Sequence, residues 1–212
     1  MAGKSIVTLP MGINSNLVVG LTGGMGCGKS TAAALFVECG FTAIDTDRIV
    51  REQLLPDPAV AAAIREHYGP AVAAPDGSIL RARLADIVFR DKTALSWLED
   101  LLHPGVRAHC ERVITASHGA AFIVEVPLLF EKGLENWFDF TVCVTADSRQ
   151  QLHRLQQRGI PPELASQRIA RQLPLTRKSE LADYVLLNDG SVQFLREQVR
   201  QLAAQLSKAP IA

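Results

Sequence analysis

A glycine-rich segment at residues 23–31 carries residue types suited to binding phosphate. Its letters, GGMGCGKST, match the pattern G-x-x-x-x-G-K-[ST] at every fixed position. Glycines let the backbone wrap a phosphate and aim several N–H groups at it, where larger side chains would obstruct the approach. We expect Lys29 to reach the β- and γ-phosphates of a nucleoside triphosphate, and the hydroxyl of Ser30 to bind Mg²⁺.

The motif also lies in the context that it requires, between an apolar strand pattern and a helix pattern. An accidental glycine-rich turn is therefore the weaker interpretation. Cys27 fills a variable position, and a reactive thiol beside a helix N-terminus is the alternative for it. The residues predicted to contact the nucleotide in this loop are Gly24, Gly26, Cys27, Gly28, Lys29, Ser30 and Thr31.

An acidic pair, Asp45 and Asp47, ends the next apolar run. In an open α/β sheet the carboxyl ends of the strands line the ligand crevice, so we expect Asp47 close to the phosphate loop. A carboxylate there can accept the proton of an attacking hydroxyl or hold it in line with the γ-phosphate. Capping of the following helix is the alternative for both residues, and we favour it for Asp45.

A basic segment spans residues 149–178, with seven basic residues and one acidic residue. Arg154 and Arg158 are four residues apart and share one helix face. Such a face could close over a triphosphate as a lid, neutralise developing charge and exclude water. The alternative is a solvated basic surface.

Five short apolar runs are predicted to be the strands that position these residues: 16–21, 41–45, 122–126, 140–145 and 184–187. They are continuous rather than alternating, which favours a parallel sheet covered on both faces. Helix patterns follow most of them, so we predict a three-layer α/β/α P-loop NTPase fold with a five-stranded parallel sheet. About 75 residues separate the second run from the third, too many for a plain crossover, and they carry helix patterns at 58–67, 81–89, 92–101 and 104–117.

This spacing predicts the domain organisation. Residues 55–117 would form an inserted helical subdomain for the acceptor, and residues 149–183 a lid. Residues 1–16 are interpreted as a flexible extension. The nucleotide-binding core would comprise 17–54, 118–148 and 184–212.

Composition excludes several classes of protein. Lys plus Arg and Asp plus Glu number 22 each, so the formal net charge is zero. A strongly basic nucleic-acid binder or a polybasic membrane protein is therefore disfavoured, and no apolar stretch approaches the ~18–20 residues of a membrane span. The four cysteines form no CxxC pair, which favours reduced thiols in a cytoplasmic protein.

The motifs also narrow the choice among nucleotide-binding proteins. The N-K-x-D sequence with which a GTPase reads guanine is absent, and the third strand offers a single acidic residue, Glu125, where a motor ATPase usually has a pair. Size and two insertions favour a small kinase that uses Mg²⁺ and ATP. The alternatives are another small-metabolite or nucleoside monophosphate kinase, and a non-catalytic, nucleotide-dependent regulatory protein.

Residues 17–52, LVVGLTGGMGCGKSTAAALFVECGFTAIDTDRIVRE, resemble the opening of dephospho-CoA kinases, with a GxTGGxGxGKST loop followed by D-x-D. The resemblance continues to about residue 206. It includes a DG…R..L element, LE…HP, a VPLLfE signature, Q..R...R and a C-terminal aD..i.N.G. In this chain these elements contain Arg81, His103, Leu128, Leu129, Glu131, Gln151, Arg154 and Asn188.

The resemblance implies transfer of the ATP γ-phosphate to the ribose 3′-hydroxyl of dephospho-CoA, the last step of coenzyme A synthesis. It implies that Asp47 is the catalytic base, that Lys29 and Arg154 act on the phosphates, and that Asn188 lies at the adenine. The residues that it implies in acceptor binding are Thr22, Asp47, Arg81, His103, Leu128, Leu129 and Glu131. Surface or helix-capping roles for Arg81 and His103, and core packing for the leucines, remain the alternatives.

Overall fold

The computed structural model describes residues 15–88 and 90–208. The predicted extension over residues 1–16 therefore lies outside the described residues, apart from its last two. Of these two, Asn16 is fully buried. Its amide donates to Ile114 O and Ser117 O, both at 2.8 Å, and Ala120 N donates to its Oδ1 at 2.9 Å. Asn16 is thus part of the folded chain, because its amide satisfies buried backbone groups.

The described chain divides into two compact units. One comprises the described residues up to Ile44 and from Ile114 onward, and the other runs from Asp45 to Val113. The helical interval was predicted to begin at residue 55. The second unit begins instead at Asp45, the last residue of the second strand, and a helix starts at the next residue, Thr46, without an intervening loop.

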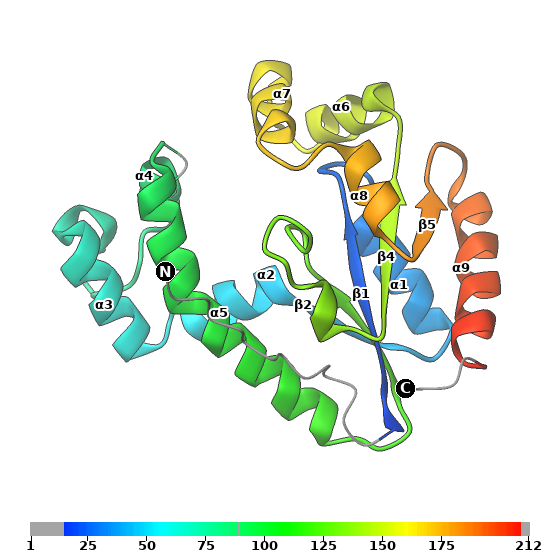
Figure 1. Cartoon of the computed structure of the whole chain (residues 1–212). Coiled ribbons are helices and arrows are strands. Elements are labelled where there is room, and N and C mark those ends of the chain that lie inside the picture. Colours follow the sequence, from blue (N-terminus) through cyan, green and yellow to red (C-terminus); the bar gives the residue numbers. More distant parts are fainter. Residues whose placement is uncertain (1–14, 89, 209–212) are drawn as a thin grey trace, which may run out of the picture. The chain divides into compact units, whose positions relative to one another are not determined.

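The first unit contains the predicted five-stranded parallel sheet, in the order β2-β3-β1-β4-β5 (Figure 1). Every residue of the central strand is buried, because it is flanked by strands on both edges and covered on both faces. Val18 pairs with Phe122, and Val19 with Phe140. The strands are β1 (Leu17–Gly23), β2 (Thr42–Asp45), β3 (Ala121–Glu125), β4 (Phe140–Thr145) and β5 (Tyr184–Leu187).

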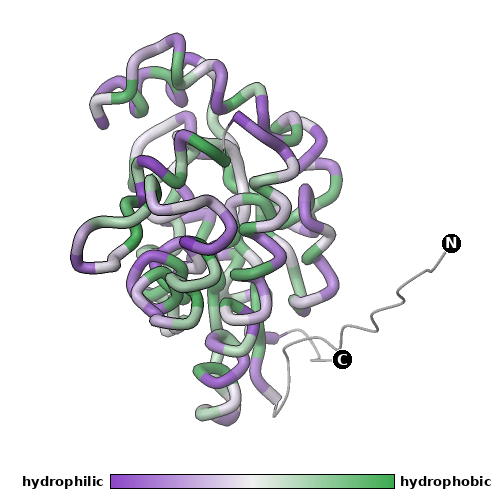
Figure 2. The backbone as a smooth tube through the Cα atoms, turned by 90° about the vertical axis from the view of Figure 1, so that its left-hand side faces the viewer, coloured by the Kyte–Doolittle hydropathy of each residue, from purple (hydrophilic) through white to green (hydrophobic). Residues whose placement is uncertain are grey.

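Helices α1 (Lys29–Glu38) and α9 (Val192–Leu206) pack side by side on this sheet (Figure 1). Their apolar faces share a core with β1 and β4 that includes Phe36, Val144 and Leu195. The remaining helices of the unit are α6 (Ser148–Gln157), α7 (Pro162–Ala170), α8 (Leu175–Leu181) and the short 3-10 helix η4 (Glu135–Trp137). The tube in Figure 2 alternates between hydrophilic and hydrophobic along the helices, as expected of amphipathic segments that cover a core.

The second unit is helical and has its own small core, which includes Ile64, Leu84, Leu98 and Leu102. Its elements are α2 (Thr46–Ile49), the π-helix η2 (Val50–Leu54), α3 (Pro58–Tyr68), the 3-10 helix η3 (Pro70–Val72), α4 (Arg81–Val88) and α5 (Lys92–Thr115).

The prediction of separate helices at 92–101 and 104–117 is wrong. Residues 92–115 form one helix, α5, with Pro104 inside it. His103 is therefore not a helix cap. Apolar residues on both sides of the proline, Leu98 and Val106, are buried. Their burial offsets the cost of the backbone hydrogen bond that proline removes. No helix among the residues described is long and apolar enough to cross a membrane.

Candidate active site

The phosphate loop joins β1 to α1, and its glycines adopt backbone conformations that other residues avoid. Gly26 has φ +80° and Gly28 has φ +92°, both in the left-handed region. Gly28 precedes α1 as its N-cap and has no side chain that could cap the helix. The N-cap residue therefore supplies no side-chain acceptor to the N–H groups of the first turn, which suits an anion at the positive end of the helix.

Helix α6 lies closely over this loop. A Cβ built on Gly26 would lie 2.8 Å from the backbone oxygen of Gln151, and one on Gly24 would lie 2.8 Å from Cys27 Sγ. Gln151 is buried, and its amide donates to Ala146 O at 2.8 Å. Glycine is thus needed at Gly26 for close packing as well as for its conformation.

Lys29 is held at the start of the loop. Its Nζ donates to Gly23 O at 3.3 Å and to Gly24 O at 3.2 Å. These contacts keep the ammonium group folded back over the loop backbone, within the same few residues that would wrap a phosphate.

Ser30 follows Lys29 in the first turn of α1, and its hydroxyl donates to Glu125 Oε1 at 3.3 Å. Glu125 ends β3, the strand next to β1, so the sheet brings the two residues together. A hydroxyl and a carboxylate are the hard oxygen ligands that Mg²⁺ prefers, and Mg²⁺ commonly uses one or two protein ligands together with phosphate oxygens. The donor set therefore fits Mg²⁺. The sequence alone did not place Glu125 beside Ser30, because strand order is not visible from spacing.

Arg154 links the loop to the end of the last strand. Its Nη2 donates to Asn188 O at 2.8 Å, and its Nη1 lies 3.4 Å from Gly26 O. Asn188 in turn donates from Nδ2 to Cys27 O at 2.8 Å and is buried. The fold thus brings together three residues that the sequence predicted at the nucleotide, since the parallel strands β1, β4 and β5 end at the same edge of the sheet and α6 begins three residues after the end of β4.

Cys27 is fully buried inside the loop. Burial raises the pKa of its thiol, and the nearby positive charge of Lys29 lowers it only in part. A buried neutral thiol is a poor nucleophile, so the structure disfavours the reactive-thiol interpretation.

The predicted acceptor residues of the first unit lie in the loop after β3, except Thr22, which lies in β1. Leu128 is partly exposed, whereas Leu129 is fully buried and packs over Gly20. Thr22 is also fully buried, and its hydroxyl donates to Pro127 O at 3.3 Å.

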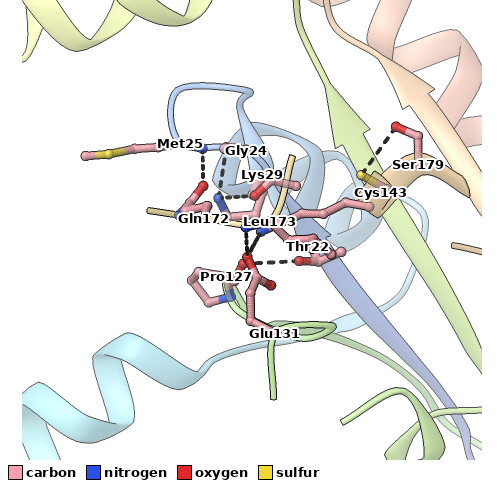
Figure 3. A network of polar contacts seen from close by, with 12 residues as sticks. Thr22, Gly24, Met25, Lys29, Pro127, Glu131, Cys143, Gln172, Leu173 and Ser179 are labelled. Carbon is pink, nitrogen blue, oxygen red and sulfur yellow. Dashed lines mark hydrogen bonds and ion pairs between the residues drawn. The ribbon is translucent and has the colours of Figure 1, made fainter. Parts of the chain in front are cut away.

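Glu131, which lies near Pro127 and Leu173 in Figure 3, forms an ion pair with Lys178 of α8, with Nζ 2.8 Å from Oε1. Sequence reasoning gave Lys178 no individual role and counted it only among the basic residues of the lid. One signal was present: Lys178 follows Leu175 by three residues, which places it on the side of α8 that faces the core.

The other predicted residues belong to the second unit. Asp45 caps α2, as favoured, because its Oδ1 accepts from Arg48 N at 3.0 Å. Asp47 is not the cap, since it is the second residue of α2, in the first turn of the helix, and its side chain is exposed. Arg81 is exposed at the first residue of α4, and His103 is partly buried within α5.

Known proteins resemble this chain over most of its length. The family model described as "Dephospho-CoA kinase" matches residues 17–193. A dephospho-CoA kinase of Streptomyces avermitilis is 41% identical over 192 residues, which cover 90% of this chain and 94% of the relative.

Solved structures agree with this match. The structure of TT1252 from Thermus thermophilus superposes with a TM-score of 0.80 at 31% identity, over 90% of this chain and 98% of the other. The dephospho-CoA kinase from Campylobacter jejuni gives a TM-score of 0.66 at 27% identity, over 91% and 98% of the two chains. Together with the phosphate loop, these matches show that the chain belongs to the dephospho-CoA kinase family.

Proposed function

We propose that this kinase transfers the γ-phosphate of ATP to the 3′-hydroxyl of the ribose of dephospho-CoA, with Mg²⁺ as cofactor. The observation that carries the proposal is the start of α1. Its first turn follows two glycines in the left-handed conformation, of which the N-cap Gly28 has no side chain that could cap the helix, and Lys29 is held at the loop backbone. This arrangement supplies N–H dipoles and a positive charge where phosphates bind.

Positioning and charge stabilisation are the main contributions of a protein to phosphoryl transfer. We assign Lys29 to the β- and γ-phosphates. We assign Arg154 to the charge that develops during transfer, because its guanidinium already lies beside Gly26 O and Cys27 O. Asn188 would support the nucleotide by fixing the loop through Cys27 O.

Ser30 and Glu125 are the residues that would hold Mg²⁺. The ion supplies neutralisation of negative charge on the phosphate oxygens. In this chain the hydroxyl of Ser30 and the carboxylate of Glu125 already share a hydrogen bond, which keeps both oxygens oriented toward each other.

We propose Asp47 as the base that accepts the proton of the attacking hydroxyl. The resemblance of the D-x-D segment supports this role, and so do the different positions of the two aspartates at the start of α2. Asp45 caps α2 by accepting from Arg48 N, whereas the side chain of Asp47 is exposed in the first turn of the same helix.

Within the first unit, we assign contacts with the acceptor to the loop after β3. Leu128 is partly exposed and suits the apolar arm of the acceptor, whereas Leu129 and Thr22 are buried and would support the loop from beneath. Arg81 and His103 would meet its anionic groups. We also propose the cytoplasm as the location, because all four cysteines are free in the structure.

A panel of acceptors tests the proposed function. Radiolabelled ATP would be offered with dephospho-CoA, AMP, GMP, CMP or shikimate, and without acceptor. We expect transfer to dephospho-CoA to exceed every other reaction. Preference for another acceptor would indicate a different metabolite kinase, and phosphate release that does not depend on an acceptor would indicate a nucleotide-dependent switch.

A further inference from the structure

Lys178 is a buried charge with an unusual set of contacts. Its side chain is 0% exposed, and that of its partner Glu131 is 15% exposed. Nζ lies 2.8 Å from Glu131 Oε1 and donates to Pro127 O at 2.9 Å. Lysine is almost never fully buried unless it is paired, so both contacts are needed to hold the ammonium group in place.

The pair joins separate segments of the first unit (Figure 3). Glu131 Oε1 also accepts from Leu173 N at 2.9 Å, so it holds the segment between α7 and α8. Pro127 O accepts from Thr22 as well as from Lys178, and Thr22 directly precedes the phosphate loop. Two oxygen atoms, Glu131 Oε1 and Pro127 O, therefore connect three segments: the loop after β3, the base of the predicted lid and the end of β1.

The same lid segment also reaches the phosphate loop itself. Gln172, next to Leu173, accepts from Met25 N through its Oε1 at 3.1 Å. Residues 172–178 thus contact the phosphate loop at one end and the loop after β3 at the other. A shift of Lys178 or Glu131 would be passed to the backbone of both loops, because the contacts are direct hydrogen bonds.

Stability alone does not explain a buried pair at this junction. Replacing a buried ion pair with apolar residues is often neutral or stabilising, because the desolvation of two charges offsets their attraction. The pair is also imperfectly satisfied, since Glu131 Oε2 is buried and accepts no hydrogen bond from any described residue. What distinguishes the pair is its hydrogen-bonding geometry, because its bonds hold three backbone segments in one arrangement.

We propose that Lys178 and Glu131 are positioning residues for phosphate transfer. Through Pro127 O and Leu173 N, the pair fixes the positions of the loop after β3 and of the base of the lid relative to the phosphate loop. Neither residue needs to touch the reacting atoms for this role. The inference rests on the kinase activity proposed above, so transfer by the unmodified protein is measured first; its absence would count against that activity and not against the pair.

Four variants of the full chain test the proposal: Lys178→Met, Glu131→Gln, the double variant and Lys178→Arg. The glutamine keeps an oxygen that can accept from Leu173 N, so the double variant removes both charges but leaves that hydrogen bond possible. The matched control is Arg177→Met. Arg177 neighbours Lys178 on α8, and its ion pair with Glu180 is exposed, with side-chain exposures of 56% and 62%.

Two readouts separate positioning from stability. We expect each single variant to lower kcat about 10- to 100-fold, as misplacement of a catalytic arrangement by about 1 Å does, with KM for ATP within about threefold. We expect the double variant to recover a melting temperature close to that of the unmodified protein, while its kcat stays as low as that of the single variants. Lys178→Arg should regain part of kcat, and the control should stay within about twofold of the unmodified protein.

Three results would overturn the proposal. The first is a kcat in Lys178→Met within about threefold of the unmodified protein. The second is recovery of kcat together with the melting temperature in the double variant, which would show that the pair only stabilises the fold. The third is a raised KM for dephospho-CoA in Glu131→Gln without loss of kcat in Lys178→Met, which would make Glu131 a direct acceptor contact. If Lys178→Met does not fold, the double variant and Lys178→Arg still give the comparison.

Discussion

Replacing Gly26 with alanine should damage nucleotide binding more than a comparable change elsewhere. The residue has φ +80°, and the left-handed conformation costs a residue with a Cβ about 1–2 kcal/mol. The new Cβ would also lie 2.8 Å from the backbone oxygen of Gln151, which is not the end of a flexible side chain and cannot easily move aside. Overpacking of this kind adds about 1–3 kcal/mol.

Gly40 is the matched control. It has φ +91°, but a Cβ there would meet nothing within 4 Å. Gly40→Ala therefore carries the conformational cost without the clash. For a chain of this length about 1 kcal/mol lowers the melting temperature by about 2–4 °C, so we expect the control to lose about 2–8 °C and to keep its affinity for ATP.

Gly26→Ala should lower the melting temperature further, or relieve the clash by moving the loop away from α6. In either case we expect the Kd for ATP to rise at least about tenfold, because the loop N–H groups lose their common direction. Calorimetric titration of ATP and thermal unfolding of both variants would check this. An ATP affinity within about twofold of the unmodified protein, or equal losses in the two variants, would refute the argument from close packing.

Further predictions concern the charged residues and the cysteines. Asp47→Asn should lower kcat by about two to four orders of magnitude, and equilibrium binding of ATP should be unchanged; an unaltered kcat in a steady-state assay would exclude it as the base. Lys29→Ala should reduce transfer by about 10²-fold or more in the same assay, because it removes a positive charge from the phosphates. Arg154→Lys should not restore the activity lost in Arg154→Ala, since one ammonium group cannot reproduce donors to both Asn188 O and Gly26 O; equal activity of the lysine variant and the unmodified protein would contradict this. Burial raises the pKa values of Cys110 and Cys143 from 9.0 to about 11. The unfolded chain therefore releases these protons first as pH rises, so the free energy of unfolding should fall between pH 9.0 and about 11. Denaturant unfolding across that range should show the decline, and replacing both cysteines with alanine should flatten it.

The strands and the phosphate loop could be predicted because their signals are local. A continuous apolar run such as that of β1 indicates a strand buried on both faces, and the glycines of the loop report backbone conformations that the structure shows at Gly26 and Gly28. The cap at Asp45 is local as well, since it involves a backbone group three residues away.

The continuity of α5 could not be predicted in the same way. Proline at position 104 is normally a sign that a helix starts or ends, and the local sequence supports that interpretation. The helix continues because Leu98, Leu102 and Val106 are buried on both sides of the proline. Burial of apolar side chains is a tertiary effect, and here it outweighs the local preference.

The sequence by itself determined the chemistry of the phosphate loop, because that loop works through backbone groups within a few consecutive residues. The tertiary structure decided which distant side chains meet there. Glu125 lies beside Ser30 because β3 neighbours β1. Arg154 meets Asn188 because α6 begins just after the end of β4, and β5, the parallel neighbour of β4, ends at the same edge of the sheet. Lys178 is buried against Glu131 for the same kind of reason, since strand order and helix packing, and not spacing along the chain, set which charges lose contact with water.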